Sequence, residues 1–265
     1  MMYLCDNFRS KLRLIRMIKA EKTLDYLKLV SILSRYWLTR RNCKVDMTLS
    51  INGVWYRLTD LESLFIVSPR YEEWIWKYLR PKYGDVFIDV GAHIGKYTLI
   101  IASIVGKNGK VIAIEPVPYN FEALLHGIRL NRLTNVIALN IALWSKECLL
   151  PLYIGQYYRK NSPAGLLGLG GSSIKRKVGK KIKVVAKTLD NVVKELNLNC
   201  VNWIKIDVEG SEREVLEGAK GTIRKYKPRI IAECTINVGE TVEFMKSLGY
   251  SYVKIYQNYF YFQPM

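Results

Sequence analysis

A glycine-containing segment near the middle of the chain, followed by a separate glutamate, has the spacing of a nucleoside-binding site. Asp89 stands two residues before Gly91 in the sequence Asp-Val-Gly-Ala-His-Ile-Gly, and Glu115 follows 24 residues after Gly91. Glycines at a strand–helix junction let the backbone approach a ligand, and the helix N-terminus offers free N–H groups. An acid at the end of the next strand accepts hydrogen bonds from ribose hydroxyls. The pattern therefore predicts a nucleoside cofactor.

The glycine spacing narrows the choice of cofactor. The dinucleotide fingerprint is G-x-G-x-x-G, whereas this chain has G-x-x-x-G and contains no Gly-Lys-Ser/Thr sequence of a P-loop. An acid at Asp89 would repel a pyrophosphate, but it suits a cofactor with an ammonium group and a positive sulfur. The site thus favours S-adenosylmethionine, with a nicotinamide dehydrogenase or a purely structural turn as alternatives.

Two carboxylates at the carboxyl end of the strand predicted over 202–207 are the main candidates for catalysis, Asp207 and Glu209. Methyl transfer from a sulfonium is an in-line displacement, so the enzyme must align the acceptor oxygen and help to remove its proton. A carboxylate does this directly, or Asp207 does it by holding a divalent metal ion. The alternative for Glu209 is a cap on the following helix. His93, as a base or a substrate contact, is a third candidate.

Three further residues are expected to contact the acceptor. Glu233 ends the run 229–233 on the same edge of the predicted sheet, and Ser172 and Ser173 lie in a Gly-rich loop that would close over the acceptor. Strand alternation instead predicts a structural role for Lys205.

Alternating strands and helices position these residues. From Asp85 onward, strands are expected at 86–90, 111–115, 136–143, 202–207 and 229–233, and helices at 94–105, 120–132, 212–225 and 240–248. Two closing strands, 252–256 and 259–262, suggest an antiparallel hairpin. The alternation implies an α/β fold whose mostly parallel, seven-stranded sheet has helices on both faces.

Positive charge dominates the composition. The 265 residues include 41 Lys+Arg and 23 Asp+Glu, a net charge of +18. Residues 1–50 carry a net +7, and Lys175–Lys187 holds seven basic residues and no acid. Such a field attracts polyanions or anionic membrane surfaces. Nucleic acid is therefore a candidate partner, and residues 9–40, read as a basic amphipathic helix, predict contact with the surface of a membrane.

The charge keeps two alternatives open. One is a nucleic-acid methyltransferase acting on a ribose 2′-hydroxyl, since the chain lacks the motifs for exocyclic amines and for pyrimidine C5. The other is a non-catalytic basic module that binds a membrane or nucleic acid through its first 45 residues. Five scattered cysteines and the absence of an uninterrupted apolar segment favour a cytoplasmic protein. The oligomeric state is not predicted.

Several spaced segments resemble the FkbM-type methyltransferases. Arg80–Thr98 is similar to their opening segment and Glu115–Asn120 to their second-strand segment. Four later stretches continue the resemblance, namely 188–190, 204–212, 215–219 and 228–233. The resemblance covers roughly residues 68–250. His93, where the family usually has Asn, departs from it, and the basic segment before residue 45 is not explained by it.

The resemblance implies a Rossmann-like class I fold and O-methylation that depends on S-adenosylmethionine. The acceptor class it suggests is a sugar, a glycolipid or a small natural product. By matched position, Asp89, Gly91, Ala92 and Gly95 would line the methionine part of the cofactor, Glu115 with Pro116 would bind the ribose, and Asn140 and Ala142 would lie near the adenine.

These patterns divide the chain into three parts. Residues 1–45 are expected to form a basic helical extension. Residues 46–80 would form a hairpin about Asn52-Gly53 and a helix from Ser68-Pro69 to Leu79. Residues 81–265 would form the methyltransferase domain, interrupted by an inserted loop at 144–190 with no helix of its own.

Overall fold

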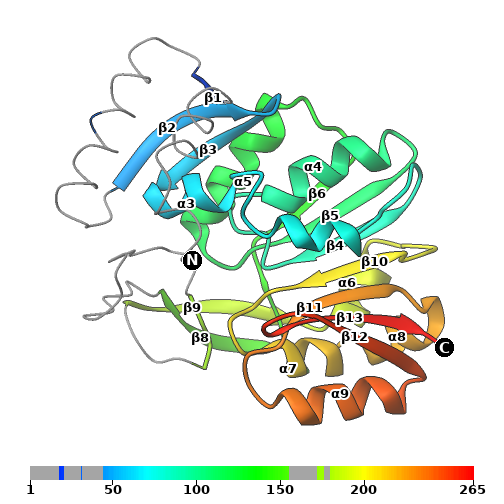
Figure 1. Ribbon diagram of the computed structural model, residues 1–265. Coiled ribbons are helices and arrows are strands. Elements are labelled where there is room, and N and C mark those ends of the chain that lie inside the picture. The colour runs from blue at the N-terminus through cyan, green and yellow to red at the C-terminus, as the bar shows by residue number, and fades with distance from the viewer. Residues whose placement is uncertain (1–17, 21–30, 32–43, 155–171, 176–179) are drawn as a thin grey trace.

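The computed structural model of the protein describes residues 18–20, 31, 44–154, 172–175 and 180–265 (Figure 1). Its centre is a seven-stranded sheet in the order β12-β13-β11-β10-β4-β5-β6. Neighbouring strands run parallel except at β13, which pairs antiparallel with β11 and β12. The strands are β4 (Val86–Val90), β5 (Lys110–Ile114), β6 (Val136–Leu139), β10 (Trp203–Ile206), β11 (Arg229–Glu233), β12 (Tyr250–Tyr256) and β13 (Tyr259–Pro264). The predicted mostly parallel sheet with an antiparallel C-terminal hairpin is confirmed.

Helices cover both faces of this sheet (Figure 1). One face packs against α6 (Leu189–Glu195), α7 (Glu212–Glu217), α8 (Lys220–Tyr226) and α9 (Val238–Ser247). The other packs against α4 (Lys96–Val105) and α5 (Pro118–Leu130). Because the central strands are enclosed on both sides, all residues of β4 and β10 are buried, including the polar Asp89 and Lys205. The carboxyl ends of the parallel strands therefore share one edge, where the predicted site residues meet.

Two elements are broken where the sequence predicted one. The third strand, expected over 136–143, ends at Leu139, and β7 (Ala142–Leu143) belongs to another sheet. The helix expected over 212–225 is divided into α7 and α8. At the break, a Cβ on Gly218 would lie 2.1 Å from the carbonyl oxygen of Trp144, so only glycine fits there. Asp190 caps α8 by accepting hydrogen bonds from the backbone of Gly221 and Thr222, at 2.8 and 2.6 Å.

The insertion at 144–190 is not only a loop. Its ends form β8 (Cys148–Ile154) and β9 (Lys180–Lys187), which pair antiparallel, and β9 also pairs with β7. Alternate residues of this small sheet, among them Leu152, Val184 and Ala186, are buried in a separate core. The basic residues of β9 occupy the other face, which is why the strand pattern was hidden in a charged run. The range also contains the start of α6.

The segment before the central sheet contains a three-stranded antiparallel sheet of β1 (Ile18–Ala20), β2 (Lys44–Ile51) and β3 (Val54–Asp60). The expected turn at Asn52-Gly53 is present, with both φ angles positive. Ile18–Ala20 was expected to be helical, but it pairs with β2 and satisfies that strand's open edge. The rest of the predicted extension at 1–45 lies outside the described residues, apart from Ser31, which is helical, and Lys44–Val45 at the start of β2.

The prediction of one long helix over residues 68–79 is wrong. An α-helix, α3 (Leu61–Ile66), comes earlier because Asp60 and Ser63 form a capping box. It is followed by a short 3₁₀ helix, η1 (Glu73–Lys77), whose Ile75 packs on the central sheet with Leu79. Among the described residues, no helix is both long and apolar enough to cross a membrane.

Candidate functional site

The loop between β4 and α4 lies directly against the end of β10. Gly91 has a φ of +79°, and a Cβ there would lie 1.9 Å from the carbonyl oxygen of Asp207. The N–H of Gly91 also donates to the carbonyl of Ile114, at 2.9 Å. Gly91 is thus required by close packing of three strand ends. The same packing brings the loop expected to bind the cofactor next to Asp207.

Two further residues of this loop have positive φ angles. His93 has a φ of +52°, and Gly95, with a φ of +96°, immediately precedes α4. A Cβ on Gly95 would lie 2.7 Å from the Leu124 side chain. Ala92 is buried and contributes to a small core with Leu124. The loop therefore presents backbone rather than bulky side chains at the start of the helix.

Asp89 is fully buried at the end of β4. Its Oδ2 atom accepts a hydrogen bond from the Thr98 hydroxyl at 2.6 Å, whereas among the described residues Oδ1 has no partner. Burial raises the pKa of Asp89, and the nearby Lys205 ammonium opposes this. A buried carboxylate oxygen without a partner is costly unless a ligand donates to it. The ammonium group of S-adenosylmethionine supplies such a donor, so Asp89 fits the role that the sequence predicted.

Glu115 lies immediately beyond β5 and is 3% exposed. Its two carboxylate oxygens accept hydrogen bonds from the backbone N–H groups of His93 and Val117, at 2.8 and 2.9 Å. Burial raises the pKa of Glu115 to about 7. The Asn120 side chain is a third hydrogen-bond partner of Glu115. A carboxylate has about four acceptor positions, so about one remains for a ribose hydroxyl. Its chemistry fits the ribose role, while its present contacts fix the cofactor loop.

The residues predicted near the ribose and adenine occupy different environments. Asn140 is exposed between β6 and β7, and its side-chain amide donates to the carbonyl of Glu115 at 2.8 Å. Pro116 is partly buried in the turn before α5. The Ala142 side chain is buried in the core of the small sheet, packed with Val117 and Leu152. Only its backbone is therefore available to a ligand.

The acidic residues at the ends of β10 and β11 form a pair. Asp207 hydrogen-bonds with Glu233. Burial raises the pKa of Glu233 to about 9, and the charge of Asp207 adds to the shift. For Asp207, burial is outweighed by Lys205 and by the hydrogen bond with Glu233, and its pKa is lowered. The pair therefore holds one proton near neutral pH, on Glu233, and leaves Asp207 charged.

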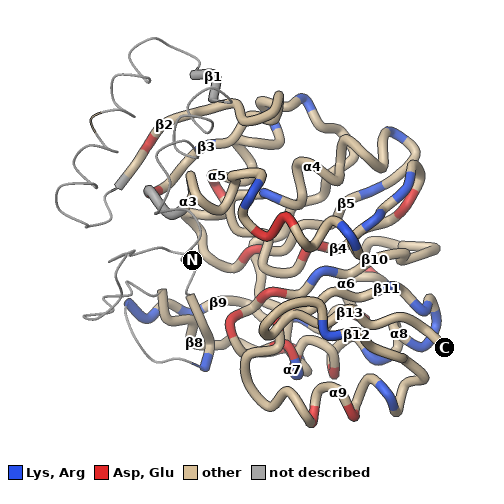
Figure 2. The backbone as a smooth tube through the Cα atoms, viewed as in Figure 1, with Lys and Arg blue, Asp and Glu red and all other residues tan. Residues whose placement is uncertain are grey.

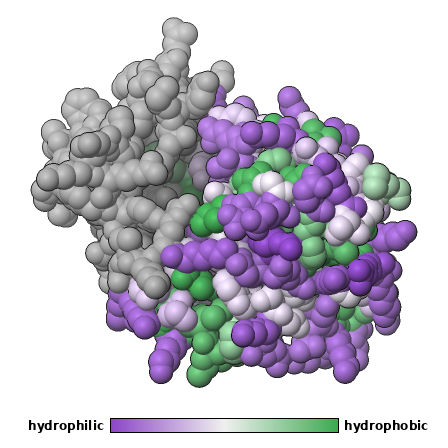
Figure 3. Space-filling view, turned by 90° about the horizontal axis from the view of Figure 1, so that it is seen from below, coloured by the Kyte–Doolittle hydropathy of each residue, from purple (hydrophilic) through white to green (hydrophobic). Residues whose placement is uncertain are grey.

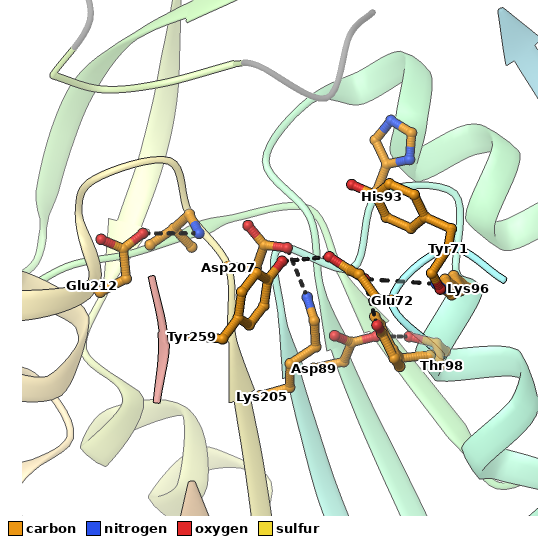
Figure 4. A network of polar contacts seen from close by, with 12 residues as sticks. Tyr71, Glu72, Asp89, His93, Lys96, Thr98, Lys205, Asp207, Glu212 and Tyr259 are labelled. Carbon is orange, nitrogen blue, oxygen red and sulfur yellow. Dashed lines mark hydrogen bonds and ion pairs between the residues drawn. The ribbon is translucent and has the colours of Figure 1, made fainter. Parts of the chain in front are cut away.

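Lys205 supplies the positive charge beneath this pair. Its Nζ lies 3.2 Å from Asp207 Oδ2, and its side chain is 3% exposed. On the neighbouring strand it stands in register with Asp89. Burial disfavours its charge, but Asp207 and Asp89 outweigh this and raise its pKa. The residue predicted to be structural thus connects the cofactor carboxylate to the acceptor carboxylate (Figure 4).

Glu72 is a member of the site that the sequence did not indicate. It precedes η1 with a φ of +56°, and its carboxylate accepts hydrogen bonds from the hydroxyls of Tyr97 and Tyr259. The Lys96 ammonium lies 3.6 Å from it. Burial lowers the pKa of Lys96 to about 8, and Glu72 opposes this shift. Figure 4 shows this cluster beside Asp207 and Lys205. No motif surrounds Glu72, so only the tertiary structure could reveal it.

The loop after β10 is held by a residue other than Glu209. Glu212 accepts hydrogen bonds from the backbone N–H groups of Gly210 and Val208, at 2.9 and 3.4 Å. Ser211 precedes α7 without a side-chain cap. Ser211 is thus the N-cap residue of α7 and Glu212 holds the turn before it, while a capping role for Glu209 stays a prediction. Glu209 adopts a φ of +54°, and its charge contributes to the raised pKa of Glu233 after burial and Asp207.

The insertion contacts this same loop. The Ser173 hydroxyl donates to the carbonyl of Glu209 at 2.8 Å, and its backbone pairs with Tyr153 of β8. Ser172, beside it, is partly buried. The structure thus brings the two predicted serines to the loop that carries Asp207 and Glu209. Their contact with an acceptor stays a prediction.

His93 has an unusual position. Its two ring nitrogens are buried and have no hydrogen-bond partner among the described residues, and Figure 4 shows the ring beside Tyr71. Burial lowers the pKa of His93, against the charges of Asp60 and Asp207. The ring is therefore neutral near neutral pH. A neutral imidazole can accept a proton or a hydrogen bond from a ligand. The expected contact between His93 and the substrate stays a prediction.

The described residues offer no group of three or more His, Cys, Asp and Glu side chains arranged to hold a metal ion. Asp207, the predicted ligand, is paired with Lys205 and Glu233. Metal ligation by Asp207 stays a prediction.

A family model described as the methyltransferase FkbM domain matches residues 89–252. The chain belongs to the FkbM methyltransferase family. Methyltransferase sdnD of Sordaria araneosa is 27% identical over 190 residues, which cover 62% of this chain and 71% of that protein. The 31-O-demethyl-FK506 methyltransferase FkbM of Streptomyces tacrolimicus is 26% identical over 198 residues, covering 66% of this chain and 75% of that protein.

The fold agrees with this assignment. The crystal structure of methyltransferase FkbM from Methylobacillus flagellatus matches with a TM-score of 0.52 at 16% identity, covering 76% of this chain. This chain spans about half of that protein, since the match covers 54% of it. The FkbM domain identifies the protein as a methyltransferase that depends on S-adenosylmethionine, with a Rossmann-like class I fold.

Proposed function

We propose that this FkbM methyltransferase methylates a hydroxyl oxygen of a neutral acceptor, of the class of sugars, glycolipids or small natural products. The observation that carries the proposal is the Asp207–Glu233 pair at the edge of the sheet where the cofactor loop lies. One member stays ionised while the other keeps a proton. Glu233 donates its proton to Asp207 and holds it in place, and ionised Asp207 is left to accept a hydrogen bond from the acceptor hydroxyl.

S-adenosylmethionine, when bound, supplies a methyl group on a positively charged sulfur. Asp89 would bind its ammonium group and Glu115 a ribose hydroxyl. Asp207 accepts the hydrogen bond of the acceptor hydroxyl and so directs an oxygen lone pair at the methyl carbon. As the new oxygen–carbon bond forms and the carbon–sulfur bond breaks, the acceptor proton passes to Asp207 and then to water. S-adenosylhomocysteine and the methyl ether are the products.

The low pKa of Asp207 is compatible with this role. An alcohol becomes acidic only as its oxygen gains the methyl group, so a weak base suffices if it is already in place. Lys205 keeps Asp207 ionised, and protonated Glu233 fixes its orientation. The two residues next to Asp207 therefore act as positioning residues.

The charge of the site favours a neutral acceptor over a nucleic acid. As far as the structure describes the chain, the site holds the carboxyl groups of Asp89, Asp207, Glu72 and Glu233 but, beside them, only the ammonium groups of Lys96 and Lys205. Phosphate groups that approached Asp207 would be repelled by it and by Glu209. The name of the Streptomyces relative gives a substrate that lacks an O-methyl group, which supports oxygen as the methylated atom.

The experiment combines cofactor binding with acceptor screening. S-adenosylhomocysteine is titrated calorimetrically into the wild type and the Asp89→Asn and Asp46→Asn variants. Asp89→Asn is expected to weaken binding about 10- to 100-fold, because a charged hydrogen bond contributes about 1.5–3 kcal/mol. Asp46 is exposed on the hairpin and serves as the control.

The wild type is then incubated with radiolabelled S-adenosylmethionine and a panel of glycosides, glycolipids, polyketides and RNA. Mass spectrometry and NMR locate the methyl group. A methyl ether on a neutral acceptor is the expected result. A methyl group on nitrogen or carbon, or transfer to RNA alone, would contradict the proposal.

A further inference from the structure

Two aromatic side chains stack at the edge of the sheet that carries the carboxyl pair. Trp74 belongs to η1, and Tyr256 is the last residue of β12. Their ring centroids lie 5.1 Å apart at an interplanar angle of 29°. Although one side of its ring is used in this contact, Tyr256 remains 42% exposed. Trp74 beside it is half-buried, so the two rings form a small aromatic patch that is open to solvent on the Tyr256 side.

Tyr259 connects this stacked pair to the catalytic carboxyls. Its ring lies 4.7 Å from that of Trp74, edge to face at 70°. On the sheet it stands directly opposite Glu233, and its hydroxyl donates to Glu72. The hairpin that carries Tyr256 and Tyr259 therefore ends at the carboxyl edge. Tyr259 is itself part of the network of Figure 4, so this network extends to Trp74 through one ring contact.

We propose that Trp74 and Tyr256 form a stacking platform for a pyranose ring of the acceptor, which narrows the acceptor class to carbohydrates. This inference rests on the proposed O-methyltransferase function. A pyranose has a face of C–H bonds, which packs on an aromatic ring, and a rim of hydroxyl groups. The carboxylates of Asp207 and Glu209 at this edge are acceptors for those hydroxyls.

The neighbouring charges distinguish this ligand from another class of flat molecule. Nucleotides also stack their bases on aromatic residues, but they carry phosphates, which neighbouring carboxylates repel. A sugar carries no such charge. The apolar platform and the neighbouring carboxylates together therefore match a neutral glycoside.

The β12 strand provides a matched control. Tyr252 is 41% exposed, close to the value for Tyr256, but it packs near Phe260 and Phe262 instead of Trp74. Tyr256→Ser removes the platform, and Tyr252→Ser removes an equally exposed tyrosine elsewhere on the same strand. Tyr256→Phe keeps the ring and loses only the hydroxyl.

The test uses the full chain saturated with S-adenosylhomocysteine and the methyl glycosides of glucose, mannose and rhamnose as probes. Saturation-transfer NMR measures their binding, and calorimetry measures S-adenosylhomocysteine binding to each variant. At least one glycoside should bind the wild type, with upfield shifts of its C–H protons. Tyr256→Ser should weaken this binding about five- to tenfold, as expected for one aromatic contact. Tyr256→Phe and Tyr252→Ser should change it by less than about twofold.

Three results would overturn the platform while cofactor binding stays intact. They are the absence of glycoside binding to the wild type, unchanged binding in Tyr256→Ser, and an equal loss in Tyr252→Ser. If the wild type failed to bind S-adenosylhomocysteine, the proposed function itself would fail, and this inference with it.

Discussion

At the scale of single residues, the strand ends give two carboxyls of nearly the same chemistry opposite protonation states. Asp207 faces the Lys205 ammonium, whereas Glu233 faces other carboxylates, namely Asp207, Glu209 and Glu72. Their surroundings, rather than their residue types, therefore decide that Asp207 acts as the base and that Glu233 donates a hydrogen bond to it. The sequence identified both positions, because each stands at the carboxyl end of a predicted strand. It could not predict their protonation states, since only the folded structure shows that Lys205 and Glu72 lie near them.

The pH dependence follows from the Glu233 proton. With a pKa of about 9, against an ordinary value of 4.5, Glu233 is neutral across the physiological range. Activity should fall above about pH 9, because ionised Glu233 repels Asp207 and no longer donates to it. In Glu233→Gln the amide still donates, so the rate profile should lose this alkaline decline while keeping activity at pH 7.

The same shift has a consequence for stability. The folded state holds the Glu233 proton more tightly than the unfolded chain does. The contribution of this bound proton to the free energy of unfolding is therefore fully present below about pH 4.5 and is lost as the pH rises towards about 9. In Glu233→Gln, the midpoint of thermal unfolding should fall less than in the wild type as the pH rises through this range. An alkaline decline of activity that persists in Glu233→Gln would contradict the assignment.

Asp207→Asn tests the base. The amide cannot take the acceptor proton, so kcat should fall about 10²- to 10⁴-fold. S-adenosylhomocysteine affinity, measured by calorimetry, should change little. Glu209→Gln, on the same loop, should lower kcat less than about tenfold, because the contact that fixes this loop to Ser173 is made by the Glu209 carbonyl. Similar losses in the two variants would show that Asp207 has no special role.

At the scale of elements, the central strands could be predicted because burial on both faces leaves continuous apolar runs. The errors have a common cause. Breaks at Leu139 and Gly218, and the early start of the helix capped by Asp60, depend on contacts with distant segments. The β8–β9 hairpin was missed because exposed lysines alternate with the residues buried in its small core. Alternation is weak evidence when one face of the strand is highly charged.

Gly91→Ala tests the close approach of β4 and β10. The new Cβ would lie 1.9 Å from the Asp207 carbonyl, so the strand ends must separate. Gly84 has a similar φ, +86° against +79°, and a Cβ there would meet nothing within 4 Å, so Gly84→Ala carries only the cost of the backbone conformation. Gly84→Ala should cost about 1–2 kcal/mol of unfolding free energy, and Gly91→Ala at least about 2 kcal/mol more. Urea denaturation measures both, and equal costs would contradict the packing argument.

At the scale of the whole molecule, the positive charge and the site are separate. Lys and Arg are distributed over most of the outer elements (Figure 2), and hydrophilic residues predominate on the face shown in Figure 3. In the part of the chain that the structure describes, most Lys and Arg side chains therefore lie at the surface, apart from Lys96 and Lys205, while the cluster around Asp207 is rich in carboxyl groups. The sequence suggested a nucleic-acid partner from the sum of charges, but a sum does not show where the charges lie. Binding of polyanions and methyl transfer should accordingly be independent.

The lysines of β9 provide the test of this independence. Lys181 and Lys183 are exposed on the outer face of the β8–β9 hairpin, opposite Tyr153 and Pro151. In the double variant Lys181→Glu/Lys183→Glu, the slope of log K against log salt for single-stranded RNA should fall by about 1.4, since each lost phosphate contact contributes about 0.7. The rate of methyl transfer to a neutral acceptor should not change.

The control, Lys220→Glu/Lys254→Glu, makes the same change of net charge at exposed lysines of α8 and β12. If RNA binds at the hairpin, this control keeps the wild-type slope. If only the overall field matters, both double variants change it equally, and the hairpin has no special part in binding. A fall in methyl transfer in the hairpin variant alone would instead place Lys181 and Lys183 in acceptor recognition. The acceptor would then be anionic, against the argument from the acidic site.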